Sequence, residues 1–255
     1  MDIRQALGLP HLLDAKRIVC VQPHPDDNEV GAAGTLIEMS KRGCEVIYVT
    51  VTDGRAGSEM QTAEPQELAH IRRQEMFRAG AIVGVTKHIE LGFPDGGDYR
   101  VHQVTERLVA VLRQYAPDVV MTVDPWMPYE AHPDHIKTGK AVAAAVLFAS
   151  NGVLFPMSGA PTPIPQVAFY ATSYPNTYVD ITSHWDEKLE SIHTHASQFD
   201  NPEWPMLSGY LAYQANEVYR SWKKDTDPED FAGYAEAFKV LATKQLHFFP
   251  SALYS

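Results

Sequence analysis

Residues 17–150 alternate short apolar runs with longer amphipathic stretches. The apolar runs are rich in β-branched residues and stop at Pro, Gly or Asp, which is typical of strands. The stretches between them carry apolar residues at helical spacing. The predicted strands are 17–22, 46–52, 88–91 and 119–123, and the predicted helices are 29–41, 66–79, 101–115 and 136–150. This alternation indicates a Rossmann-like three-layer α/β fold, in which helices cover both faces of a mostly parallel sheet.

The pattern loosens after Asn151, where prolines recur between 156 and 175 around a single predicted strand at 167–170. We therefore expect 151–180 to form a loop or lid insertion beside the sheet. Two more helices are predicted, at 185–196 and 228–242. Because no internal repeat or low-complexity segment divides the sequence, we predict one domain over residues 1–255.

Composition and charge exclude several classes of protein. Hydrophobic residues make up 45% of the 255 residues and charged residues 21%, as in ordinary soluble proteins. The net charge of −11 and the lack of a basic run argue against nucleic acid as a partner. The N-terminus lacks a signal-peptide pattern and the apolar run 141–149 is too short to span a membrane. We expect a cytoplasmic protein with no membrane partner, in which Cys20 and Cys44 are buried and unpaired.

Two clusters of histidine and aspartate follow predicted strands. The first strand runs directly into His-Pro-Asp-Asp at 24–27, and the fourth runs, after a loop, into His-Pro-Asp-His at 132–135. Each cluster alone could be a turn or a helix cap. Both clusters, however, fall at the carboxyl edge of the same sheet, where ligands of α/β proteins bind. Three imidazoles and three carboxylates at one edge favour a metal site.

Nitrogen and carboxylate ligands without thiolates suit Zn²⁺, and a catalytic zinc needs three protein ligands. The predicted ligands are His24, Asp27 and His135. Asp26 cannot easily point the same way as its neighbour Asp27, so it is the candidate general base for the attacking water. His132 is the candidate hydrogen-bond donor to the oxyanion that forms when a carbonyl is attacked.

The chemistry predicted from these residues is metal-assisted hydrolysis of an amide. Asp134 is expected to orient one of the imidazoles from behind. No redox cofactor is needed, since Gly-Ala-Ala-Gly at 31–34 lacks the spacing of a dinucleotide-binding fingerprint. We interpret these glycines as positions of close helix packing.

The motifs together resemble the PIG-L/LmbE-like zinc-dependent de-N-acetylases. The resemblance lies in the segments 24–27, 34–36, 52–54, 72–75 and 132–135, in this order and spacing. It implies an LmbE-like fold, zinc bound by the His and second Asp of the first motif and by the last His of the second, and the first Asp as base. Those roles fall on the residues assigned above.

Residues 124–131 and 195–199 are similar to the archaeal diacetylchitobiose deacetylase subgroup of that family. This similarity implies removal of one acetyl group from the non-reducing sugar of diacetylchitobiose, and a homo-oligomer. Asn28 departs from the family pattern, because most members have Glu directly after the two aspartates. The zinc ligands are intact, but the role of that side chain is left open.

Four further residues are candidate sugar contacts: Arg72, Asp95, Trp126 and His247. Each also has an ordinary structural interpretation, namely a solvated helix face, a turn, a core or interface aromatic, and a tail histidine.

Tyr129 and Glu130 are expected near the metal because they precede the second motif. His193 and His195 are interpreted as packing residues of a helix.

The leading hypothesis is therefore a deacetylase of N-acetylglucosaminides that takes a small amino-sugar substrate. A second hypothesis keeps the chemistry but uses an N-acetylglucosaminyl conjugate, such as the precursor of a low-molecular-weight thiol. A carbohydrate-binding relative without catalysis is opposed by the intact base and ligands. A nucleotide-binding module is opposed by the missing glycine fingerprint.

Overall fold

The computed structural model describes residues 7–58, 64–224, 233–247 and 252–253. A seven-stranded sheet runs through the described residues in the order β3-β2-β1-β4-β5-β7-β6. Its strands are β1 (Arg17–Gln22), β2 (Glu45–Thr52), β3 (Val85–Phe93), β4 (Val119–Val123), β5 (Gln166–Tyr170), β6 (Thr177–Asp180) and β7 (Ala235–Ala242). Strands β1 to β5 are parallel, whereas β7 pairs antiparallel with both β5 and β6. The predicted mostly parallel α/β fold is confirmed.

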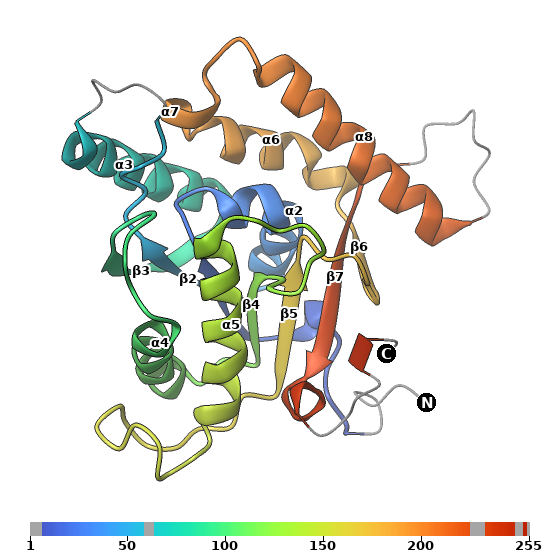
Figure 1. Cartoon of the computed structure of the whole chain (residues 1–255). Coiled ribbons are helices and arrows are strands. Elements are labelled where there is room, and N and C mark those ends of the chain that lie inside the picture. The colour runs from blue at the N-terminus through green and yellow to red at the C-terminus, as the bar shows by residue number, and fades with distance from the viewer. Residues whose placement is uncertain (1–6, 59–63, 225–232, 248–251, 254–255) are drawn as a thin grey trace.

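Helices cover both faces of this sheet (Figure 1). The helices are α2 (Asp27–Lys41), α3 (Pro65–Val83), α4 (Val101–Tyr115), α5 (Pro133–Phe148), α6 (Trp185–His193), α7 (Ala196–Phe199) and α8 (Trp204–Lys223). Short 3-10 turns are η1 (Leu12–Asp14), η2 (Thr182–His184) and η3 (Thr243–Leu246). None of the described helices is long and apolar enough to cross a membrane.

Two apolar clusters hold the layers together, one on each face. Alternate residues of a strand point to opposite faces, so Ile18 and Cys20 pack with α2 while Val19 and Val21 pack with α4 and α5. Strands buried on both faces need near-continuous apolar sequences, which is why β1, β2 and β4 were predictable. Cys20 and Cys44 are both buried and unbridged, as predicted.

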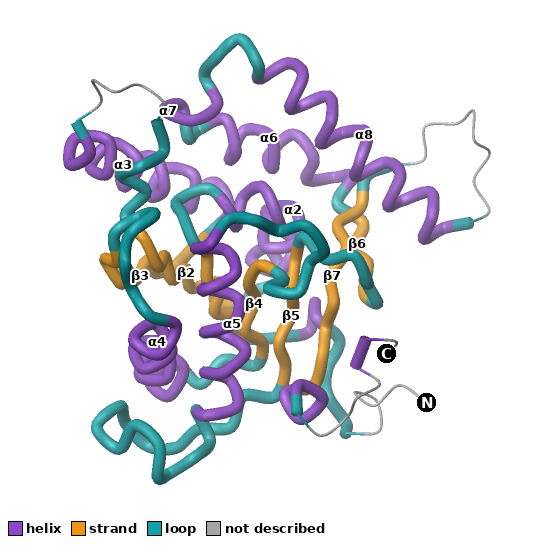
Figure 2. The backbone as a smooth tube through the Cα atoms, viewed as in Figure 1, coloured by secondary structure: helices purple, strands orange, loops and turns teal. Residues whose placement is uncertain are grey.

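The C-terminal part differs from the prediction in three elements (Figure 2). The predicted helix 228–242 is wrong over 235–242, which is strand β7, and residues 228–232 lie outside the described residues. Helix α8 and strand β6 were not predicted. The sequence of β7 contains Ala, Glu and Lys, which favour helices, but Glu236 and Lys239 are buried in the sheet with polar partners. Tertiary packing therefore overrides local preference there.

The predicted insertion 151–180 divides into two parts. Residues 151–162 gather around the buried Arg113 near the end of α4, at the sheet edge opposite the carboxyl ends of the strands (Figure 1). The Arg113 guanidinium donates hydrogen bonds to the backbone carbonyl oxygens of Ala149, Asn151, Leu154, Phe155 and Gly159. This part is no lid over the carboxyl edge, and residues 166–180 instead supply β5 and β6.

Candidate active site

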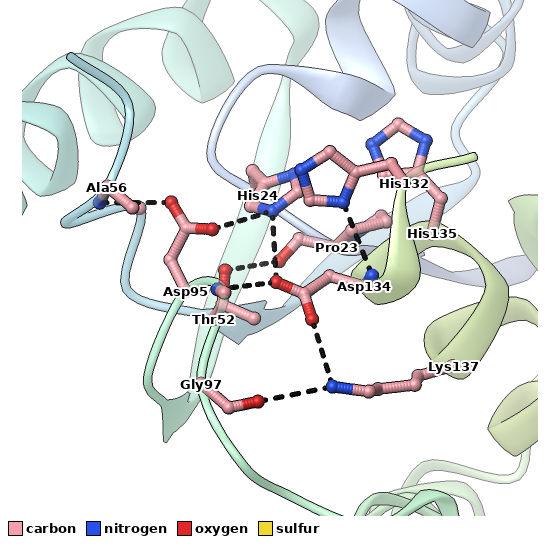
Figure 3. Close-up of polar contacts among 12 residues, drawn as sticks. Pro23, His24, Thr52, Ala56, Asp95, Gly97, His132, Asp134, His135 and Lys137 are labelled. Atoms are coloured by element: carbon pink, nitrogen blue, oxygen red, sulfur yellow. Dashed lines mark hydrogen bonds and ion pairs between the residues drawn. The ribbon is translucent and has the colours of Figure 1, made fainter. Parts of the chain in front are cut away.

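Four parallel strands end at one edge of the sheet, and the chain after each strand contributes to a single cluster of polar side chains. Residues 24–27 follow β1, residues 53–57 follow β2, Asp95 follows β3, and residues 132–135 follow β4 after a loop. Figure 3 shows the imidazole of His24 facing Asp95 across this edge, with Nε2 of His24 3.1 Å from Oδ1 of Asp95. The predicted convergence of the two His/Asp motifs therefore exists in the structure.

The three predicted metal ligands lie together. One ligand atom each from His24, Asp27 and His135 falls within 4.8 Å of the others. Oδ1 of Asp27 is 3.4 Å from Nε2 of His135, and Oδ2 is 3.3 Å from Nδ1 of His24. Two imidazole nitrogens and a carboxylate form the donor set that a catalytic zinc uses.

The surroundings of His24 are strongly acidic. Its Nε2 lies 3.1 Å from Asp95 and 3.5 Å from Asp134, while Nδ1 faces Asp27. Burial lowers the pKa of His24, but its contacts with Asp134, Asp27 and Asp95 outweigh burial and raise the pKa to about 12. The cluster thus favours a positive charge at this point, and a divalent cation bound to the neutral ring would supply it.

Glu130 orients the imidazole of His135. Oε2 of Glu130 is 3.1 Å from Nδ1 of His135, on the side of the ring that faces away from Asp27. A carboxylate at this nitrogen holds the proton on Nδ1 and leaves the lone pair of Nε2 for a metal. Glu130 therefore lies next to one of the three predicted ligands, as expected from its place shortly before the second motif.

A second group of potential ligands, His24 with His132 and Asp134, shares one residue with the first. The Asp134 carboxylate is already used, because Oδ2 accepts from the backbone N–H of Gly96 at 2.8 Å and Oδ1 from the Tyr99 hydroxyl at 2.8 Å. The geometry therefore favours the group with Asp27, and gives Asp134 the orienting place behind His24 that the sequence predicts.

Asp26 is held apart from Asp27 by its backbone and by Arg72. The residue immediately precedes α2 with φ 126° and ψ −24°, and its carboxylate accepts a hydrogen bond from Nη2 of Arg72 at 3.0 Å. Burial raises the pKa of the Asp26 carboxyl to about 6, although the Arg72 guanidinium lowers it. A carboxylate with a pKa near the operating pH is suited to proton transfer.

His132 precedes α5, with its ring exposed at the edge of the cluster. Its Nδ1 accepts the backbone N–H of Asp134 at 3.2 Å, which places the proton of the neutral ring on Nε2. Burial, together with the neighbouring imidazoles of His24 and His135, holds the pKa of His132 below its usual value. The ring is therefore neutral and can donate from Nε2.

A cavity of ≈ 330 Å³ joins several of these groups. It is lined by His24, Asp26, Ala56, Gly57, Arg72, Asp95, Gly96, His132 and Gln198. Of the predicted sugar contacts, Arg72 and Asp95 line this cavity. Arg72 is not on a solvated face, since it is 3% exposed and also donates to the carbonyl oxygens of Pro25 and Gly54.

Trp126 and His247 lie elsewhere. Both line a different cavity of ≈ 350 Å³, together with apolar residues such as Phe169 and Leu241, and no described residue lines both cavities. The Trp126 ring is 57% exposed and packs edge-on against Phe169. The structure therefore does not bring these two candidates to the cavity that holds Asp26, and their role in sugar binding stays a prediction.

Three polar residues near the site were not predicted to take part. Gln198 lines the cavity, and Glu29 forms an ion pair with His195 at 3.4 Å. Both members of this pair have fully buried side chains. Glu29 stands two residues after the first motif, and only this proximity in sequence could have drawn attention to it.

Asn28, which departs from the family pattern, points into the core. The backbone N–H of Asn28 donates a hydrogen bond to Oε1 of Gln22, and the side-chain oxygen of Asn28 accepts one from the Tyr170 hydroxyl at 3.3 Å. The side chain thus bonds to core groups and not to the predicted ligands.

Comparisons with known proteins agree with this geometry. The diacetylchitobiose deacetylase of Thermococcus kodakarensis is 37% identical over 202 residues, which cover 78% of this chain and 76% of that protein. A probable N-acetyl-α-D-glucosaminyl L-malate deacetylase 2 of Bacillus anthracis is 30% identical over 204 residues, covering 72% of this chain and 82% of that protein.

Among solved structures, the N,N'-diacetylchitobiose deacetylase from Pyrococcus horikoshii, complexed with its inhibitor MPG, superposes with a TM-score of 0.88. Its sequence is 32% identical, and the match covers 97% of this chain and 92% of that one. The family model described as PIG-L, GlcNAc-PI de-N-acetylase, matches residues 19–146, a range that holds the three ligand positions as well as Asp26 and His132. The chain therefore belongs to the PIG-L (GlcNAc-PI de-N-acetylase) family.

Proposed function

We propose that this chain is a zinc-dependent hydrolase that removes the N-acetyl group from the non-reducing N-acetylglucosamine of diacetylchitobiose and releases acetate. The observation that carries the proposal is the arrangement of His24, Asp27 and His135 beside a separate carboxylate, Asp26. The family and the deacetylase relatives support an enzyme acting on N-acetylglucosamine. The retained base argues against an inactive relative.

His24, Asp27 and His135 would hold the zinc ion, which when bound supplies a Lewis acid for the acetamide carbonyl and for the attacking water. Glu130 and Asp134 keep the two imidazoles oriented, since each contacts the ring from the side away from the shared ligand group. Carboxylates behind metal-binding histidines fix the tautomer and raise the basicity of the ligand.

Asp26 takes the proton of the attacking water. As the C–N bond breaks, the same proton can pass to the departing amine nitrogen, so that acetate and a free amino sugar result. Arg72 holds the Asp26 carboxylate in place, and the Nε2–H of His132 donates to the oxygen on which negative charge develops.

A metal analysis combined with an acetate-release assay tests this proposal. We expect zinc in the purified protein and acetate release from diacetylchitobiose. His135→Ala should lower zinc content and activity together, because it removes one of three protein ligands. Full zinc content with normal turnover in His135→Ala would refute the ligand assignment.

The runner-up function uses the same residues on another molecule. If an N-acetylglucosaminyl conjugate of a thiol precursor is deacetylated far faster than diacetylchitobiose, that substrate class replaces ours.

A homo-oligomer and a cytoplasmic location belong to the proposal as well. Exposed aromatic side chains such as Trp126, Tyr129 and Tyr213 support self-association, which light scattering of the purified protein would measure.

A further inference from the structure

The catalytic cavity opens into a larger one. A second cavity of ≈ 770 Å³ shares Ala56, Gly57 and Gln198 with the lining of the first. Its other walls include Ser197, Asn201, Pro202 and Glu203, and we call this space the 197–203 groove. At ≈ 330 Å³ the catalytic cavity is near the lower end of the volumes of ligand pockets, about 300–1,000 Å³, so a larger substrate must continue beyond it.

The groove is fixed to the same helix that positions Arg72. The buried carboxylate of Glu75, one turn further along α3, accepts from the backbone N–H of Ser197 at 2.8 Å and from its hydroxyl at 2.6 Å. The side chain of Gln198 donates to the carbonyl oxygen of Gly57 at 3.0 Å. Figure 1 shows α7 beside α3, consistent with these contacts. A shift of the groove relative to the catalytic cavity would break buried hydrogen bonds.

Gly57 stands at the junction of the two cavities. A Cβ atom at this position would lie 2.1 Å from Nη1 of Arg72 and 2.9 Å from Oε1 of Gln198. Because glycine has no side chain, the side chains of Arg72 and Gln198 can both lie close to residue 57, where the two cavities meet.

The lining of the groove is polar without being cationic. It presents amide and hydroxyl groups and the exposed carboxylate of Glu203, and none of its described lining residues is Lys or Arg. Asn201 links the two ends of the 197–203 segment, because its side-chain amide donates a hydrogen bond to the carbonyl oxygen of Gln198 and accepts one from the backbone N–H of Glu203. Such groups hydrogen-bond to uncharged hydroxyls, whereas an anionic ligand would meet a carboxylate in a protein of net charge −11.

From this continuity and chemistry we infer that the 197–203 groove is the subsite for the second, uncharged sugar ring of the substrate. The inference rests on the proposed function, which supplies the first ring in the catalytic cavity. The cavity beside Trp126 is the competing place for the second ring, but no described residue joins that cavity to the catalytic one, and its lining is largely apolar.

Blocking the groove tests the inference. Because both native cysteines are buried, Glu203→Cys introduces an accessible thiol that a bulky methanethiosulfonate reagent can modify reversibly. We expect modification to lower the ratio of kcat/KM for diacetylchitobiose to kcat/KM for N-acetylglucosamine, and a reducing agent to restore it. Glu106→Cys, on an exposed position of α4, is the matched control and should leave both values unchanged after modification.

A charge reversal gives a second readout. Glu203→Lys should raise kcat/KM for an N-acetylglucosaminyl malate relative to diacetylchitobiose by about twofold to fivefold, the scale of an exposed ion pair.

The outcomes separate the two proposals. Unmodified protein that releases acetate from neither sugar would overturn the proposed function. An active protein whose ratio does not change after the groove is blocked, or changes only when Trp126→Cys is modified, would overturn the assignment of the groove.

Discussion

Asp26 adopts a backbone conformation that residues other than glycine rarely adopt, with φ 126°. Such a conformation costs about 1–3 kcal/mol and persists only where surrounding contacts enforce it. Arg72 provides those contacts, since Nη2 donates both to the carbonyl oxygen of Pro25 and to the carboxylate of Asp26. The strained turn separates two adjacent carboxylates, so that Asp27 faces the imidazoles while Asp26 faces the cavity.

Asp26→Asn should retain its zinc and lose roughly 10²-fold or more in kcat, because the amide cannot accept the proton of the attacking water. Metal content and acetate release would be measured on the same preparation. If metal and activity were lost in step, Asp26 would be a ligand and not the base.

Removing the donor of His132 should slow turnover by about 3 kcal/mol in activation free energy, the usual effect of one oxyanion-hole donor. His132→Ala is the variant that removes the donor, and His132→Asn, whose side chain can still cap α5 and has an amide N–H of its own, is the control that keeps the helix start intact. Zinc should remain bound in both variants. Loss of zinc would instead favour the ligand group that contains His132 and Asp134.

The residues that follow strand ends were predictable, and the more distant ones were not. His24, Asp27 and His135 follow from the rule that parallel strands share a carboxyl edge, which also explains why they meet. Gln198 reaches the site from a segment far along the chain, and its approach depends on the packing of α6 and α7 against α3. The similarity of residues 195–199 to the deacetylase subgroup includes this residue but does not indicate that it reaches the cavity. Trp126 shows the reverse case, a residue next to a motif in sequence whose ring lines another cavity.

At the scale of elements, helix α2 sets the position of the site because it begins at Asp27. The helix lies close to the sheet, since a Cβ on Gly31 would meet the Tyr170 ring at 2.4 Å and one on Gly34 would meet Ile181 at 2.7 Å. The interpretation of these glycines as close-packing positions is confirmed. A buried ion pair, Lys188 with Glu236, also holds the helix, with Glu236 accepting the backbone N–H groups of Gly34 and Thr35.

Glu236→Leu should lower the free energy of unfolding by about 3–5 kcal/mol, because it leaves the buried Lys188 ammonium without its counter-charge. The double variant Lys188→Met with Glu236→Leu should cost less than the sum of the two single changes, since no buried charge then remains. Urea unfolding of the four proteins measures this coupling. Additive effects would show that the pair does not act as a unit.

The elements of the first 150 residues were predicted well because β1, β2 and β4 are nearly continuous apolar runs, whereas β3, which contains Lys87 and Glu90, was predicted over only 88–91 of its range 85–93. Strand β7 was not predicted, since Glu236 and Lys239 interrupt its apolar pattern and become buried only through partners from distant segments. Helix α8 was missed for a different reason. Among its residues only Ala215 is buried, so the face of the helix that contacts the core is small.

For the whole molecule, the two apolar clusters lie on the faces of the sheet and include none of the predicted ligands. We therefore expect the protein to stay folded after removal of zinc by a chelator, with a Tm lower by about 5–10 °C than in zinc at 100 times its Kd. Circular dichroism and calorimetry of the chelated and reloaded protein would measure both effects. Loss of the folded state on chelation would show that the ion is part of the scaffold.

Because neither apolar cluster includes a predicted ligand, we expect the chain to fold before any metal binds and the finished pocket to accept whichever divalent cation the surroundings supply. Selection among such ions by a nitrogen and oxygen site depends strongly on their supply. The metal found in a purified sample would therefore reflect the growth medium as much as the protein. Activity compared between preparations has meaning only after the same ion has been loaded into each.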